Sequence, residues 1–154
     1  MKTAKEMTRR ELEAKVQTAF TASELFRPEL IARDGVRVWR YLRTDLLRVL
    51  VWLRFELLQV PLVCNTKTLR QRGFRDNLSP YAADKTRRGE FYVSAHCLGA
   101  GVDLTSPDMS AAAMRQKIKQ AAADVPCNIR IEGGVNWLHV DTYDMGVPVY
   151  EFTA

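Results

Sequence analysis

The sequence has few cysteines and few histidines, and it has no long apolar run that is free of charge. Its three cysteines are odd in number and far apart, which excludes a disulfide scaffold and favours buried, inert thiols in a reducing compartment. Eight glycines and six prolines without a period exclude collagen-like and low-complexity chains. The most apolar stretch, residues 46–63, contains Arg48, Arg54 and Glu56, which argues against a membrane span of about 20 uncharged residues.

Length and charge set the scale of the molecule. A chain of 154 residues that is 47% hydrophobic fits one globular domain with its own core. The net charge of +5 is uneven, because residues 1–75 carry 16 basic and 8 acidic side chains, and residues 76–154 carry 7 and 10. A basic half can meet nucleic acid or another polyanion. A solvated basic face is the simpler interpretation, and we expect no nucleic-acid partner.

The first residues, Met1 to Glu6, are polar and charged and lack the apolar core of a signal peptide. We therefore expect a protein that is made in the cytoplasm, with no membrane span and no cleavable export signal. Separately, we expect it to be a monomer. Action outside the cell would then require release through a holin or by another route.

The N-terminal third has the pattern of helices. Two Thr-x-x-Glu capping boxes, at residues 8–11 and 21–24, precede apolar residues at helical spacing. An apolar stripe with most arginines off it follows, so residues 1–58 are expected to form a helical buttress. Helices are predicted over about residues 8–20 and 22–33 and within 36–58.

The remainder alternates short apolar runs with turns. Gly133-Gly134 between two such runs predicts a two-residue hairpin, and residues 67–90 have the composition of one long loop. The pattern indicates an α+β fold in which the N-terminal helices pack on an antiparallel sheet. We expect a single domain over residues 1–154, with its catalytic core at about 60–145. Strands are predicted near residues 61–66, 90–94, 102–104, 128–132 and 135–141, and a helix at about 110–124.

The only two histidines, His96 and His139, lie in strand-like segments near aspartates. His96 and Asp103 are seven residues apart across a glycine-containing turn, which can bring both side chains to one point. Two imidazoles and a carboxylate suit zinc, which in catalytic sites has three protein ligands and an open position for water. Two histidines and an aspartate that are scattered in a sequence usually form no metal site. Spacing alone therefore leaves open whether these residues bind a metal.

These residues lie in motifs that resemble a known family. The pattern S-x-H-x-x-G-x-G-x-D over residues 94–103 is similar to the S-x-H-x-x-G-x-A-x-D signature of the M15 zinc D-Ala-D-Ala metallopeptidases, whose relatives include phage endolysins. The segment W-L-H-V-D at 137–141 resembles the part of the family that carries the last zinc ligand. Shorter likenesses at N-T, R-G-F-R and R-I-E resemble small phage and prophage members. The resemblance covers about residues 60–145.

The resemblance implies the fold of the hedgehog and D-Ala-D-Ala-peptidase group, and a zinc peptidase that hydrolyses peptidoglycan stem peptides. Arg75 matches the family arginine that polarises the scissile carbonyl or holds substrate, a role that suits a fixed guanidinium fork. Arg72 is the second candidate for that role. Trp137 either forms a wall of the pocket or belongs to the core. The implied zinc ligands are His96, Asp103 and His139.

The identity of the general base stays open, because Asn136 stands where many members of the family have an acidic residue. Asp141 and Glu132 are the carboxylates nearby. On a continuous strand, Asp141 points to the same face as His139, and the two residues are about 7 Å apart along the strand. A two-residue hairpin would place Glu132 opposite Val135, about 13 Å along the strand from His139, unless a bulge brings it closer. Both stay candidates, and Asp141 has the alternative role of orienting an imidazole.

The peptidase would act on the cell wall after release. Two other functions remain as alternatives to it. A catalytically degenerate zinc-binding module of the same fold, working as a binding or virion-associated protein, is favoured by Asn136. A nucleic-acid binder that uses the basic half is the third and weakest hypothesis.

Overall fold

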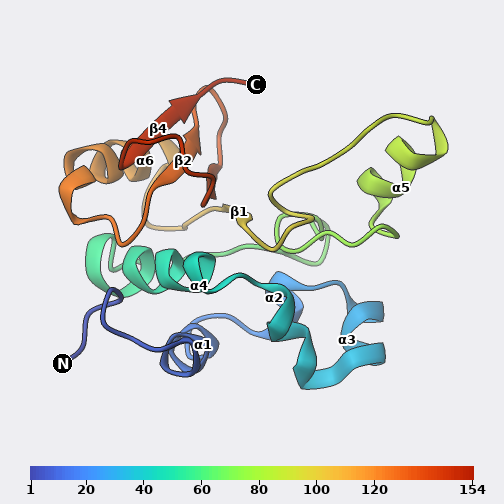
Figure 1. The fold of residues 1–154 in the computed structure, drawn as a ribbon, viewed down its shortest axis with the longest axis horizontal. Helices are drawn as coiled ribbons and strands as arrows, with labels where there is room; N and C mark the ends of the chain where they lie inside the picture. Colours follow the sequence, from blue (N-terminus) through green and yellow to red (C-terminus); the bar gives the residue numbers. More distant parts are fainter.

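The computed structural model describes residues 1–154, which form one four-stranded sheet with the N-terminal helices beneath it (Figure 1). The α+β class predicted from the sequence is confirmed. The helices are α1 (Arg9–Gln17), α2 (Ala22–Leu25), α3 (Pro28–Asp34), the 3-10 helix η1 (Gly35–Tyr41), α4 (Thr44–Val51), the π-helix η2 (Trp52–Leu57), α5 (Pro80–Arg87), α6 (Ala111–Gln120) and the 3-10 helix η3 (Ala122–Asp124). The strands are β1 (Gly101–Leu104), β2 (Ile129–Glu132), β3 (Leu138–Asp141) and β4 (Val149–Phe152).

The sheet has the order β1-β3-β2-β4 and is mixed, so the prediction of a wholly antiparallel sheet is wrong at one edge. β3 pairs antiparallel with β1 and β2, whereas β4 runs parallel to β2. Antiparallel neighbours can be joined by a short turn, but a parallel neighbour is reached only by a longer connection. No local turn signal therefore marks the pairing of β4, which has only four residues.

The predicted two-residue hairpin at Gly133-Gly134 is also wrong. β2 ends at Glu132 and β3 begins at Leu138, so the connection spans residues 133–137. The N–H of Gly133 donates to the carbonyl of Phe152 in β4 at 2.7 Å, which keeps Gly133 in line with β2. The β2–β4 contact thus holds Gly133 beside β4, and the chain reaches β3 through a longer connection than a two-residue turn.

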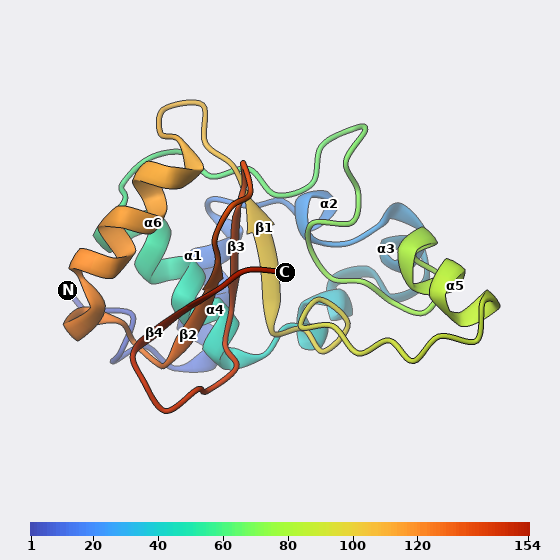
Figure 2. The same ribbon diagram turned by 90° about the horizontal axis from the view of Figure 1, so that it is seen from above.

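The sheet and the helices share one core. Figure 1 shows α4 between the sheet and α1, and Figure 2 shows α6 on the side of the sheet opposite the arm that carries α5. One cluster of 30 buried apolar residues includes side chains from α1, α4, α6 and the strands β1, β2 and β3. The N-terminal helices are therefore continuous with the core of the sheet. No helix is both long and apolar enough to cross a membrane.

The N-terminal helices follow their sequence signals closely, with one break. Thr8 and Glu11 form the predicted capping box of α1, and Thr21 and Glu24 form that of α2. The segment 36–58 is not one helix, because the backbone is extended at Leu42 and Arg43. There the N–H of Arg43 donates to the carbonyl of Gly99 at 2.8 Å. This contact ties the start of α4 to the turn that precedes β1.

Two predicted strands are absent. The segment 61–66 contributes only an isolated bridge between Val63 and Thr105, and residues 90–94 form no strand. The predicted long loop 67–90 contains α5, and with residues 91–94 it forms the arm that extends from the sheet (Figure 2).

We predict that Gly99→Ala lowers the free energy of unfolding by more than about 2 kcal/mol. Gly99 has a φ of 64°, where a side chain costs roughly 1–2 kcal/mol, and an added Cβ would overlap the carbonyl oxygen of Tyr41. Gly89→Ala is the matched control, because Gly89 has a φ of 68° but no heavy atom within 4 Å of an added Cβ. Urea unfolding of both variants measures the difference, and equal losses would contradict the role given to Tyr41.

Candidate metal centre

One face of the sheet carries the polar residues of the site. Asp103 in β1 lies directly opposite His139 in β3, and Gly101 lies opposite Asp141. Directly opposite residues of antiparallel strands point to the same face and lie about 4.5–5.5 Å apart. Strand pairing alone therefore brings Asp103 and His139 together across 36 residues of sequence.

The absence of a side chain at Gly101 leaves room for Asp141. A Cβ at that position would lie 3.0 Å from the Cβ of Asp141 and 2.8 Å from that of Ala95. Both distances are shorter than ordinary contacts between side chains. The glycine of the sequence motif thus lets the turn at Ala95 and the carboxylate of Asp141 approach β1 closely.

His96 reaches the same point from a turn and not from a strand, which corrects the sequence prediction. It lies in the turn before β1, and its Nδ1 is 2.9 Å from the carbonyl oxygen of Gly73. A carbonyl only accepts, so Nδ1 is the protonated nitrogen and Nε2 is left free to bind. Nε2 lies 3.4 Å from Oδ1 of Asp103.

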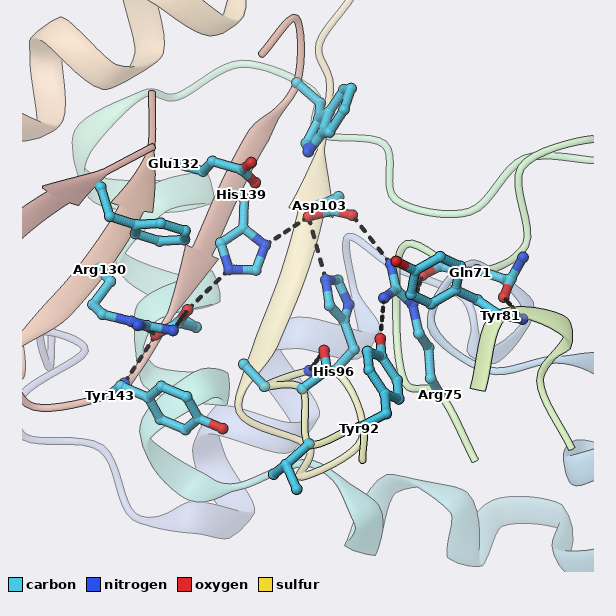
Figure 3. A pocket seen from close by; sticks show the side chains of 16 residues that line it. Gln71, Arg75, Tyr81, Tyr92, His96, Asp103, Arg130, Glu132, His139 and Tyr143 are labelled. Carbon is cyan, nitrogen blue, oxygen red and sulfur yellow. Dashed lines mark hydrogen bonds and ion pairs between the residues drawn. The ribbon is translucent and has the colours of Figure 1, made fainter. Parts of the chain in front are cut away.

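His96, Asp103 and His139 form a buried group that could hold a metal ion. Their ligand atoms all lie within 4.8 Å of one another, and each residue is at most 8% exposed. Nδ1 of His139 is 2.8 Å from Oδ1 of Asp103, so both imidazoles face the same carboxylate (Figure 3). The donor set and the spacing agree with the three protein ligands of an open metal site.

The charges of this group are coupled. Burial opposes the ionisation of Asp103, but hydrogen bonds to His139 and His96 outweigh it and hold the pKa of Asp103 well below its usual range. Burial likewise opposes the charge on His139, but its hydrogen bonds to Asp103 and Asp141 raise the pKa of His139 to about 9. A metal ion at Nδ1 would take the place of a proton, as is usual for imidazole ligands.

Asp141 lies on the side of His139 that faces away from Asp103, and it is fully buried. Its Oδ2 is 2.9 Å from Nε2 of His139 and accepts a hydrogen bond from Arg130, while its Oδ1 accepts from Arg130 and from the N–H of Tyr143. Burial opposes ionisation, but these donors lower the pKa of Asp141. All four donors are already in place, so this carboxylate has little capacity left for a water molecule.

Glu132 lies on the other side of His139, which corrects the position expected from a two-residue hairpin. β2 and β3 pair with Ile131 opposite Val140, and the same register continued by one residue places Glu132 level with His139. The carboxylate of Glu132 lines the cavity at the metal group, and no side chain donates to it (Figure 3). Asn136 is exposed and does not line this cavity.

Arg75 lies across the cavity from the sheet. Its Nη2 is 3.7 Å from Oδ2 of Asp103, its Nη1 donates to the hydroxyl of Tyr92 at 2.9 Å, and its Nε donates to the carbonyl of Gln71 at 2.6 Å. Its guanidinium carbon is 5.5 Å from the centre of the Tyr81 ring. These contacts fix the guanidinium beside the candidate metal ligands.

The structure brings most of the predicted site residues to one cavity of about 430 Å³. Arg72 does not line this cavity. It contacts the site only through its backbone carbonyl, which accepts a hydrogen bond from the N–H of Asp103 at 2.8 Å. Gln71, Tyr81, Tyr92, Arg130, Tyr143 and Phe152 also line the cavity and were not predicted. Of the predicted residues, those in the cavity are Arg75, His96, Asp103, Glu132, Trp137, His139 and Asp141.

The alternation of strand residues could have identified part of the missed set. Arg130 precedes Glu132 by two residues, so both must point to the same face of β2. Tyr81 and Tyr92 have no such signal, because they come from the arm and reach the cavity only through the tertiary fold.

Comparison with family models, curated proteins and solved structures found no match for this chain.

We predict that His96→Ala and His139→Ala each abolish stoichiometric binding of a divalent metal. Each change removes one of three donors and leaves a buried carboxylate without its partner. The metal content after loading with Zn²⁺ and dialysis is the measurement. Cys97→Ser is the control, because Cys97 adjoins His96 but does not line the cavity. Stoichiometric zinc in the double histidine variant would show that the metal lies elsewhere.

We also predict that Cys64 and Cys127 resist alkylation at pH 8 until the protein unfolds. Burial raises the pKa of both thiols, that of Cys127 to about 11, so the reactive thiolate is nearly absent at pH 8. Mass spectrometry of peptides after a short iodoacetamide pulse, with and without urea, measures the effect. Rapid labelling of both thiols in the native protein would contradict the burial seen here.

Proposed function

We propose that this chain is a zinc-dependent peptidase that hydrolyses peptide bonds of peptidoglycan stem peptides. The observation that carries the proposal is the meeting, in one cavity, of His96, Asp103 and His139 with an unpaired carboxylate and an arginine. The likeness of the two sequence motifs to the M15 peptidases supports the substrate class. Such a protein would act on the cell wall as a monomer after release from the cell.

Zinc is the metal that the donors favour. Two imidazoles with one carboxylate are a set found in catalytic zinc sites, and their ligand atoms here lie close enough to share one ion. Bound there, zinc would act as a Lewis acid and lower the pKa of a water molecule to about 7.

Glu132 is the general base in this proposal. Its carboxylate lies beside His139 and accepts no hydrogen bond from a side chain, so it is free to take a proton from the attacking water (Figure 3). It would then deliver that proton to the leaving amine. Asp141 is less suited, because it is fully buried and already accepts from Arg130, from His139 and from the backbone.

Arg75 binds the substrate in this proposal. Its hydrogen bonds to Tyr92 and Gln71 aim the guanidinium at the region of Asp103, where a carbonyl or carboxylate oxygen of the substrate would lie. A fixed positive fork stabilises negative charge that develops on that oxygen. Trp137 and Tyr81 line the same cavity and offer apolar surface to the peptide.

We expect Glu132→Gln to reduce hydrolysis of muropeptides by about 10²–10⁴-fold while one zinc ion per chain is retained, because the change removes proton transfer and leaves the metal ligands in place. Mass spectrometry of muropeptides after incubation with zinc-loaded protein gives both the activity and the bond cleaved.

Asn136→Ala is the matched control, because Asn136 holds the position where relatives have the acidic residue but lies outside the cavity. We expect it to keep full activity. Full activity in Glu132→Gln would refute the base assignment. No products from the zinc-loaded native protein would favour the non-catalytic zinc-binding module.

A further inference from the structure

The guanidinium of Arg130 is enclosed by two aromatic rings and one carboxylate. Its central carbon lies 4.5 Å from the centre of the Tyr143 ring and 4.7 Å from that of Phe152. We propose that Arg130 is a positioning residue that, through Asp141, holds His139 in its ligating orientation and so sets the affinity of the site for metal. The inference rests on the proposed function only in taking His96, Asp103 and His139 as the ligands.

The link from Arg130 to His139 consists of direct hydrogen bonds. Nε and Nη2 of Arg130 donate to the two oxygens of Asp141 at 3.0 and 2.9 Å, so the guanidinium fork grips both sides of the carboxylate. Oδ2 of Asp141 is 2.9 Å from Nε2 of His139. When Nε2 donates to this carboxylate, Nδ1 is the nitrogen left to bind metal, and it is the one that faces Asp103.

Burial makes this arrangement necessary. Asp141 has no exposed surface, and a buried carboxylate is costly unless a cation and hydrogen bonds compensate it. Arg130 supplies the cation for Asp141 from the neighbouring strand, where the two residues lie directly opposite. Without it, the carboxylate of Asp141 would lose two of its four donors and would no longer be held in place, which would release the Nε2 side of His139.

The C-terminal strand completes the enclosure. β4 pairs parallel to β2 with Phe152 opposite Glu132, and this places the Phe152 ring against Arg130. The same ring lies edge-on to His139, with centroids 5.9 Å apart. Phe152 of β4 is therefore part of the metal site, although it contributes no ligand.

An arginine is required at this position, and a lysine would not replace it. A guanidinium is planar, makes two parallel hydrogen bonds to one carboxylate and stacks on aromatic faces. An ammonium can make only point contacts, and it would fill the space between the rings of Tyr143 and Phe152 poorly. Arg130→Lys thus separates the effect of geometry from the effect of charge.

The test is the affinity of the full chain for Zn²⁺, measured by competition with a chromophoric chelator. We expect Arg130→Gln and Arg130→Lys to weaken binding by about 10–100-fold, the usual effect of losing a residue that orients a metal ligand. Phe152→Leu should give a smaller loss in the same direction. The visible spectrum of bound Co²⁺ should change in all three variants, because the geometry at His139 changes.

Lys119→Gln is the matched control. It breaks the ion pair between Lys119 and Glu151 in β4, at 2.8 Å, and touches neither Arg130 nor the cavity. We expect the native affinity and the native Co²⁺ spectrum. Thermal unfolding of each metal-free variant identifies any that fail to fold, and if Arg130→Gln fails, Arg130→Lys and Phe152→Leu decide the outcome.

The outcomes are distinguishable from those of the proposed function. Native affinity and an unchanged Co²⁺ spectrum in the folded Arg130 variants would overturn the positioning role while leaving the peptidase proposal intact. A weakening in Lys119→Gln equal to that in Phe152→Leu would also overturn it, because any disturbance of β4 would then suffice. Failure of the native protein to bind Zn²⁺ at all would refute the proposed function itself.

Discussion

The carboxylate of Asp103 is the group on which the site depends. His139, His96 and Arg75 all approach it, at 2.8, 3.4 and 3.7 Å, from three separate parts of the chain. A buried carboxylate must be compensated by partners within reach. The β1–β3 pairing supplies His139, and the turn before β1 supplies His96. The loop before α5 supplies Arg75, so the local geometry of three elements is tied to one buried charge.

The sheet supports this arrangement because its two faces have different roles. Val102 and Val140 point to the shared core, and their neighbours Asp103 and His139 point to the cavity. Apolar burial against α6 and the N-terminal helices stabilises the strands that carry the ligands. Each histidine is further held at the nitrogen that faces away from Asp103, one by the carbonyl of Gly73 and the other by a carboxylate. Both histidines are therefore held by hydrogen bonds on the side away from the carboxylate that they share.

Much of the fold and of the candidate site follows from the sequence where the signals are local. The capping boxes of α1 and α2, the start of α6 near residue 110 and the positions of β1 and β2 all agree with the structure. The predictions that are wrong have a common cause, which is that contacts between segments distant in the sequence decide the structure there. Residues 36–58 have one apolar stripe, yet the backbone is extended at Leu42 and Arg43, where Arg43 donates to the distant carbonyl of Gly99. The segment 90–94 has a strand pattern but no partner strand.

The sequence by itself determined which side chains could hold a metal, because it has only two histidines and each has an aspartate nearby at a regular spacing. Only the tertiary structure decided how the two candidate carboxylates differ. The β2–β3 register places Glu132 beside His139 with its carboxylate free, and the pairing of Asp141 with Arg130 buries the other. Register and parallel pairing join residues that are distant in sequence, so no local pattern encodes them. The contact of Phe152 with the site could not be predicted for the same reason, because β4 runs parallel to β2 and no short turn joins the two strands.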